Sequence, residues 1–251
     1  MFIDVHCHLN FEHFDVDRDE VINRAIKTGL KVIVNSGTNH KENLETLDLA
    51  SKYPHIIKAS LGLYPTYVSK LSEDELNKEL EFIKLHKDKI IAIGEVGLDH
   101  KFEDDHTKQK SAFLKIIKLA EKIDKPLVIH SREAEKEVVE ILESTNLKKI
   151  NFHCFTGNFK LVKKIVDKGW CLSIPPTIIR GLHFQGLVDI VPITQLLTET
   201  DSPFLSPPPK VRNEPSNVKI VVEKISEIKN MNVDEAKNNI FSNFQKIFLK
   251  N

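Results

Sequence analysis

The sequence predicts a (β/α)8 barrel, a single closed sheet of eight parallel strands that alternate with helices. Short runs of β-branched and apolar residues alternate with longer segments of helical periodicity along the whole chain. These runs are almost entirely apolar, as expected for parallel strands buried on both faces. Eight such units in about 250 residues match the usual size of this barrel. A doubly wound open sheet is the structural alternative, and periodicity alone does not exclude it.

The strands are expected at eight apolar runs, of which "KVIVNS" and "PLVIHS" are typical. β-branched residues favour the extended backbone of a strand. We predict one domain over residues 1–251, because the length suits one large core. The expected strands cover residues 2–6, 31–36, 56–62, 90–95, 126–131, 148–154, 170–174 and 194–199.

The helices are expected between and after these runs, where apolar residues recur at helical spacing on otherwise charged segments. Two starts carry the pattern of a capping box, Ser72 with Glu75 and Asn232 with Glu235. The expected helices cover residues 17–28, 39–52, 72–87, 106–124, 132–145, 158–168, 178–189, 216–229 and 233–249.

The charge balance argues against a general affinity for nucleic acid or membranes. Basic and acidic residues number 36 each, so contact with nucleic acid would have to occur at a local site. No apolar run approaches the length of a membrane span, and no secretion signal is evident. Three cysteines form no disulfide framework. We therefore expect a cytoplasmic protein, with no contact with membranes and no obligate protein partner.

Residues able to bind a metal ion stand at the ends of five predicted strands. In a parallel barrel, all these strand ends open on one face, where the active sites of such barrels form. An open sheet would spread the first and eighth strands apart, so this pattern favours the barrel. The residues are His6, His8, Glu95, His130, His153 and Asp201.

The pair His6 and His8 has the geometry of a metal-binding site. Side chains alternate along a strand, so these two point to the same side and Cys7 points to the other. Imidazole and carboxylate ligands without thiolate suit Zn²⁺, Mn²⁺ or related ions. Four histidines and two carboxylates are too many for one ion of low coordination number. They suit two ions that share a bridging carboxylate.

The motifs around these residues resemble those of the TatD-type metal-dependent deoxyribonucleases of the amidohydrolase superfamily. The resemblance covers almost the whole chain, and the motifs stand in family order. They are "DVHCHL" (4–9), "IGEVGLD" (93–99), "KPLVIHSREA" (125–134), "FHCFTG" (152–157), "ETDSPFLSP" (199–207), "RNEP" (212–215) and "NFQKIF" near the end.

This resemblance implies a hydrolase with two divalent metal ions (Zn²⁺, Mn²⁺ or Mg²⁺) that cleaves phosphodiester bonds, often from the 3′ end of DNA. It makes His6 and His8 ligands of one metal, which Asp201 completes, and His130 and His153 ligands of the second. Glu95 would bridge the two. The resemblance and the position of Asp201 beside the first metal both make it the expected proton acceptor. Its alternative role is that of a ligand only.

Further residues near the strand ends are candidates for supporting roles. Asp4 and Glu199 could orient ligand histidines, although Asp4 could equally cap backbone amides. The phenylalanines are expected mainly in the core, with Phe155 and Phe204 as the candidates for base stacking at the mouth of the barrel.

Three residues are predicted to contact the substrate. Tyr64 stands in "GLYP", where family members commonly have a histidine. Its phenol can donate a hydrogen bond to phosphate, but it carries no positive charge near neutral pH. Arg132 and Arg212 could bind a phosphate bidentately. The alternative for Arg132 is a surface salt bridge, for example with Glu135.

Two other functions are compatible with the same site. A deacylase that removes misacylated (D-aminoacyl) groups from tRNA would need the same activated water, because an ester and a phosphodiester make similar demands on it. A non-catalytic scaffold that retains structural metals is the third possibility, and the complete ligand set argues against it.

Overall fold

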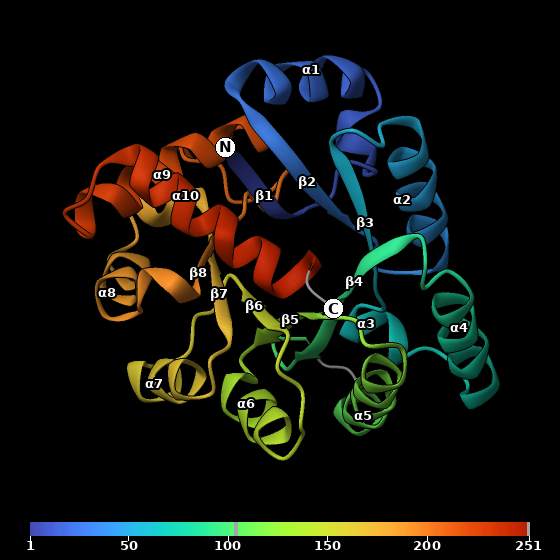
Figure 1. Cartoon of the computed structure of the whole chain (residues 1–251). Coiled ribbons are helices and arrows are strands. Elements are labelled where there is room, and N and C mark those ends of the chain that lie inside the picture. The colour runs from blue at the N-terminus through green and yellow to red at the C-terminus, as the bar shows by residue number, and fades with distance from the viewer. Residues whose placement is uncertain (103–104, 250–251) are drawn as a thin grey trace.

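The structure, a computed structural model that describes residues 1–102 and 105–249, contains one sheet of eight parallel strands (Figure 1). Each strand pairs with the next in sequence order, which confirms the predicted barrel and rules out a doubly wound sheet. The strands are β1 (Phe2–Cys7), β2 (Leu30–Ser36), β3 (Ile57–Leu61), β4 (Ile90–Asp99), β5 (Leu127–Arg132), β6 (Ile150–His153), β7 (Cys171–Ile174) and β8 (Leu196–Thr198).

The two ends of the sheet meet where β1 lies beside β8 and the segment that follows it. The amide of Asp201 donates to the carbonyl of His6 at 2.9 Å, and the amide of His8 donates to the carbonyl of Ser202 at 2.8 Å. The hydroxyl of Thr198 donates to the carbonyl of Ile3 at 2.7 Å. These bonds bring the first and last strand ends together.

Helices form the outer ring around the sheet (Figure 1). The predicted helices are present, with boundaries that differ by a few residues. The helices are α1 (Arg18–Thr28), α2 (His40–Lys52), α3 (Pro65–Val68), α4 (Glu73–Leu85), α5 (His106–Ile123), α6 (Glu135–Glu143), α7 (Phe159–Asp167), α8 (Leu182–Ile190), α9 (Val218–Ile228) and α10 (Val233–Phe244). None of the helices in the described part of the chain combines the length and apolarity that a membrane crossing needs.

Two helices begin where capping residues in the sequence predicted. Ser72 and Glu75 form the predicted capping box at the start of α4. At the start of α10, the side chain of Asn232 accepts the amide of Glu235 at 2.7 Å. The one-turn helix α3 was not predicted, because four residues are too few to show helical periodicity.

Strand β4 is longer than predicted. It was expected to end at Glu95, and it continues to Asp99. Gly97, two residues beyond the predicted end, is of a type that is common in turns. Gly97 instead allows close contact with β5. Its φ is +147°, and a Cβ there would lie 1.9 Å from the carbonyl oxygen of His130. The extension carries Asp99 to the open end of the barrel.

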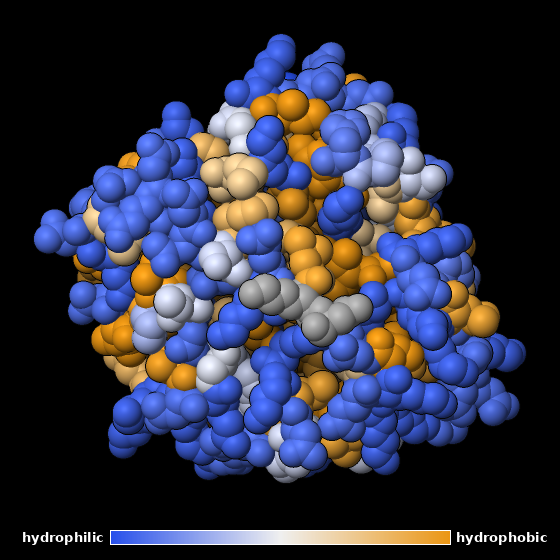
Figure 2. Space-filling view, viewed as in Figure 1, coloured by the Kyte–Doolittle hydropathy of each residue, from blue (hydrophilic) through white to orange (hydrophobic). Residues whose placement is uncertain are grey.

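The amino-terminal ends of the strands are covered by the last helix. α10 contacts β1, β8 and the turn Ile193–Gln195, and it runs across the strands in Figure 1. Predicted as one helix to residue 249, this segment is α-helical to Phe244 and continues as a π-helical turn, Gln245–Leu249. Phe244, Ile247 and Phe248 are buried there. On this face the outer helices present mainly hydrophilic residues, with hydrophobic side chains visible between them (Figure 2).

Candidate metal centre

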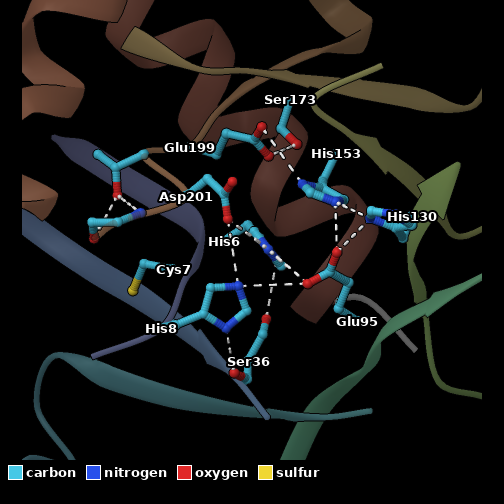
Figure 3. A network of polar contacts seen from close by, with 12 residues as sticks. His6, Cys7, His8, Ser36, Glu95, His130, His153, Ser173, Glu199 and Asp201 are labelled. Carbon is cyan, nitrogen blue, oxygen red and sulfur yellow. Dashed lines mark hydrogen bonds and ion pairs between the residues drawn. The ribbon is translucent and has the colours of Figure 1, made fainter. Parts of the chain in front are cut away.

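The six predicted ligand residues meet at the carboxyl-terminal end of the barrel, with Glu95 between the others (Figure 3). The Oε2 atom of Glu95 lies 3.5 Å from Nε2 of both His6 and His8. Its Oε1 atom lies 2.6 Å from Nδ1 of His130 and 2.9 Å from Nε2 of His153. Each carboxylate oxygen therefore faces a separate pair of imidazoles.

Asp201 lies on the side of the first histidine pair. Its Oδ1 atom is 3.4 Å from Nε2 of both His6 and His8. Its backbone has a φ of +52°, and its amide is bonded to His6, so the residue is held against the end of β1. The side chain of Asp201 is 15% exposed and that of Glu95 only 5%, so Asp201 is the more accessible carboxylate.

The donor set and its burial fit divalent metal ions. His6, His8, Glu95, His130 and His153 are all buried, although charged and titratable groups are costly to bury without partners. The Nε2 atom of His6 is buried with no hydrogen-bond partner among the described residues, and it points toward both carboxylates. A metal ion would satisfy this atom, because nitrogen and carboxylate oxygen are the ligands that Zn²⁺ and related ions take.

The pKa values in the centre reflect strong coupling between imidazoles and carboxylates. Burial lowers the pKa of His8, but Asp201 and Glu95 outweigh burial and raise it to about 9. The pKa of His6 is raised well above its usual value in the same way. Burial raises the pKa of Glu95, whereas His153 and His130 hold it well below its usual range. The carboxylates thus favour positive charge at their centre, whether from protons or from metal ions.

Hydrogen bonds behind the histidines orient their rings. Nδ1 of His6 lies 3.1 Å from the hydroxyl of Ser36, and Nδ1 of His8 lies 2.9 Å from the carbonyl oxygen of Ser36. Nε2 of His130 lies 3.0 Å from Oδ2 of Asp99. These contacts leave Nε2 of His6 and His8, and Nδ1 of His130, facing the centre.

Ser36 and Asp99 orient ligand histidines, although neither role was predicted from the sequence. Asp99 belongs to the motif "IGEVGLD", and the alternation of side chains along a strand that continued to Asp99 would have placed it on the side of Glu95 and Gly97. Ser36 is the last residue of β2, but its type carries no signal of a role in metal binding.

Glu199 and Asp4 are buried beside the candidate ligands. Glu199 accepts a hydrogen bond from Ser173 at 2.5 Å, and its other oxygen lies 3.8 Å from Nδ1 of His153. Asp4 accepts the amides of His6 and Thr200. It therefore caps backbone amides, which was one of the two roles considered for it, and contacts no imidazole ring in doing so.

Cys7 lies between two candidate ligands but takes no part in the centre. Its side chain is buried and points toward β2, where Sγ lies 3.8 Å from the carbonyl oxygen of Val34 (Figure 3). The prediction that it faces away from His6 and His8 is confirmed.

A cavity of about 540 Å³ opens above the centre. Tyr64 and Arg132 line it, whereas Arg212 does not. The lining also includes His8, Phe11, Thr38, Glu95, Phe102, His130, Ser131, His153, Cys154, Thr156, Asp201, Phe204 and Leu205.

The three predicted substrate contacts differ in their positions. Tyr64 donates its hydroxyl to Asp99 at 2.9 Å and lies 3.2 Å from Nε2 of His130, so its polar end lies behind His130, beside Asp99. Arg132 is exposed at the cavity. Arg212 instead forms two bonds with Asp17, at 2.7 and 2.6 Å, which hold it away from the cavity.

Of the two aromatic candidates at the mouth, one is buried. Phe155 is 1% exposed and packs edge-on against Phe152, so it belongs to the core and the prediction for it is wrong. Phe204 is 47% exposed and lines the cavity.

Comparisons with known proteins gave one family model and several relatives that cover most of the chain. The family model described as TatD related DNase matches residues 3–249. An uncharacterized metal-dependent hydrolase of Methanocaldococcus jannaschii is 38% identical over 247 residues, which cover 98% of this chain and 96% of the relative. The deoxyribonuclease TATDN3 of Homo sapiens is 32% identical over 259 residues, covering 99% and 94%.

Two further relatives link the same family to an activity and a solved structure. The 3′-5′ ssDNA/RNA exonuclease TatD of Salmonella typhimurium is 31% identical over 238 residues, covering 89% of each chain. The crystal structure of a TatD homologue from Escherichia coli superposes with a TM-score of 0.92 at 27% identity, covering 100% of this chain and 98% of the other.

Proposed function

This chain belongs to the TatD-related DNase family of metal-dependent hydrolases, and on that premise we propose that it hydrolyses phosphodiester bonds at the 3′ end of DNA with two divalent metal ions. His6, His8 and Asp201 would hold one ion, and His130 and His153 the other. Glu95 would bridge the two. The names of the human and Salmonella relatives support nucleic acid as the substrate.

The observation that carries this proposal is the position of Glu95. Its two oxygens face two different histidine pairs, with His6 and His8 on one side and His130 and His153 on the other. A carboxylate in this position can give one oxygen to each of two ions. A site for one ion would not need four imidazoles around both oxygens.

The bound ions would supply positive charge beside the scissile phosphate and a water of lowered pKa. Asp201 would accept the proton of the attacking water and return a proton to the leaving oxygen, because it is the more accessible carboxylate of the centre. Glu95 is too enclosed by imidazoles for that role, and its contribution to catalysis would be to hold the two ions at a constant separation.

Two residues of the cavity would contact or orient the reacting groups. Arg132 would bind a phosphate oxygen from the exposed side of the cavity. Burial and the nearby Glu95 raise the pKa of Tyr64 far above its usual value, so its phenol stays a neutral hydrogen-bond donor. Because that hydroxyl is already bonded to Asp99, Tyr64 would act first on His130 and only secondarily on substrate.

The test is metal analysis of the purified chain combined with a substrate screen. We expect two ions per wild-type chain and one per His153→Ala chain, with His55→Ala, an exposed histidine outside the cavity lining, as the matched control. Hydrolysis of 3′-labelled single-stranded DNA that is prevented by chelator and abolished by Asp201→Asn would support the proposal. One ion per wild-type chain, or DNA cleavage by metal-free protein, would contradict it.

The same screen tests the deacylase alternative. Hydrolysis of aminoacyl-tRNA with DNA left intact would replace the phosphodiesterase by an esterase that uses the same residues. Failure of the metal-loaded chain on every diester and ester would favour the scaffold.

A further inference from the structure

We propose that Phe204 and Phe11, named here the aromatic rim, form a stacking site for one unpaired nucleobase beside the metal centre. This inference rests on the proposed function for the identity of the substrate, but its geometry is independent of that function. Both residues line the cavity that also contains Glu95 and Asp201.

The two rings of the aromatic rim contact each other and neighbouring histidine rings. The rings of Phe204 and Phe11 lie 6.1 Å apart at 72°, and the ring of His13 lies 5.9 Å from Phe204 at 73°. Phe11 also stacks on His8, with 4.6 Å between ring centroids and 18° between planes. Edge-to-face contacts of this kind set the orientation of each ring.

Backbone hydrogen bonds hold Phe204 close to the metal centre. Its amide donates to the carbonyl of Asp201 at 2.9 Å, and the preceding carbonyl, of Pro203, accepts the amide of Asn213 at 2.9 Å. Phe204 therefore stands one tight turn from a candidate metal ligand. Single exposed apolar residues are ordinary on protein surfaces, but this exposed phenylalanine lines the cavity above the metal centre.

The chemistry of the cavity favours a nucleobase as the ligand of the aromatic rim. A base is joined to its phosphate through one sugar, so a phosphodiester at Glu95 and Asp201 brings a base close beside it. Every base has a π-face that stacks on an aromatic side chain whatever its sequence. Arg132, which lines the same cavity, adds a positive charge for the backbone of the same nucleotide.

The size of the cavity is suited to one nucleotide. About 540 Å³ lies within the range of sites that enclose one small ligand. A base inside a duplex has both faces covered by its neighbours, so the aromatic rim can stack only on a base that is unpaired or at an end. The aromatic rim would thus select single-stranded or frayed ends, and would tolerate any base.

Fluorescence of a Phe204→Trp variant tests this inference without any need for catalysis. The chain has a single tryptophan, Trp170, which is buried, so the introduced indole is the exposed reporter. We expect thymidine 5′-phosphate to quench it and to bind the metal-loaded variant at least about fivefold more tightly than 2-deoxyribose 5-phosphate does, as base stacking predicts. The matched control is Phe159→Trp, since Phe159 is equally exposed at 47% and lies outside the cavity lining.

Equal affinities for the two phosphates, or no quenching by either, would overturn the stacking site. A kinetic test separates this outcome from failure of the proposed function. Phe204→Ala should raise KM at least about fivefold for a single strand with a normal 3′ nucleotide, and leave KM unchanged for one with an abasic 3′ residue. If the wild-type chain cleaves neither strand, the proposed function fails, and the fluorescence comparison still decides the stacking site.

Discussion

At the scale of single residues, the orientation of each candidate ligand depends on a neighbour outside the centre. His130 is the clearest case, because Asp99 and Tyr64 both lie within 3.2 Å of its Nε2 atom. This arrangement leaves Nδ1 to face Glu95. Tyr64 therefore affects how His130 is held, in addition to any contact with phosphate.

We expect Tyr64→Phe to weaken binding of the second metal ion by about tenfold, because partners behind a metal ligand typically contribute that much to affinity. The reason is that the Oδ2 atom of Asp99 loses one of its two side-chain partners and holds His130 less firmly. Metal titration followed by calorimetry measures the effect on each ion. The control is Tyr53→Phe, whose hydroxyl also bonds an aspartate, Asp19, but at an exposed site. Equal metal affinities in Tyr64→Phe and wild type would show that Tyr64 does not position His130.

At the scale of secondary-structure elements, close backbone contacts bring the ligands together. β4 carries both Glu95 and Asp99 because it continues past two glycines. His6 lies in β1 and His8 directly after it, and backbone hydrogen bonds join both residues to the segment after β8. Residues 212–214, further along the chain, are attached to the start of α1 by two ion pairs. Arg212 pairs with Asp17, and Arg24 of α1 pairs with Glu214.

Gly97→Ala should destabilise the fold by several kcal/mol, about the size of the largest single-residue effects. The added Cβ would meet the carbonyl oxygen of His130, so β4 and β5 would separate and displace both Glu95 and His130. The matched control is Gly169→Ala, whose φ is also positive but whose Cβ would contact nothing within 4 Å. We expect about 1 kcal/mol for the control, measured for both by urea unfolding. Similar losses in the two variants would contradict the role of close strand contact.

Asp17 contributes a pH-dependent part of the stability through its bonds with Arg212 and Arg24. The hydrogen bonds from Arg212 lower its pKa from the usual 3.8 to about 2. A lowered pKa in the folded state means that the contribution is complete above about pH 4 and is lost as the pH falls through about 2.

Asp17→Asn should therefore cost about 1 kcal/mol at pH 7, a modest value because the pair is partly exposed. The difference from wild type should shrink as the pH falls from 4 to 2, in unfolding experiments at each pH. Asp48→Asn, at an exposed carboxylate of α2, is the control. A difference between wild type and Asp17→Asn that is constant between pH 4 and pH 2 would disprove this role for Asp17.

At the scale of the whole molecule, the metal centre and the last helix lie at opposite ends of one barrel. The centre draws its residues from β1, β4, β5, β6 and the segment after β8, so bound ions would link the first and last strands. At the other end, α10 and the turn after it cover the strands with Phe244, Ile247 and Phe248.

Removal of the metals should lower the melting temperature of the whole barrel. Each ion at a free concentration of about 100 times its Kd would add roughly 2.7 kcal/mol. For a chain of this size, that is about 5–10 °C per ion. Calorimetry with and without chelator measures the shift, and His6→Ala should show a smaller one. Unchanged melting on chelation of the wild type would mean that the ions do not link the strands.

The barrel, its helices and the set of six candidate ligands could be predicted from local information. Apolar runs at regular intervals define strands, periodicity defines helices, and the histidine or carboxylate at five of the strand ends follows from position along one strand. The length of β4 could not be predicted in this way, because glycine signals a turn in sequence and permits close strand contact in space.

The remaining features depend on contacts between residues far apart in the chain. Three examples are the hydrogen bond of Asp99 to His130, the ion pair of Arg212 with Asp17 and the burial of Phe155. Each involves separate elements, and residue type does not identify such partners. The same holds for the aromatic rim, in which Phe11 and Phe204 meet only because the barrel closes. Periodicity records which side of its own element a residue occupies, whereas closure of the barrel determines which residues of other elements it meets there.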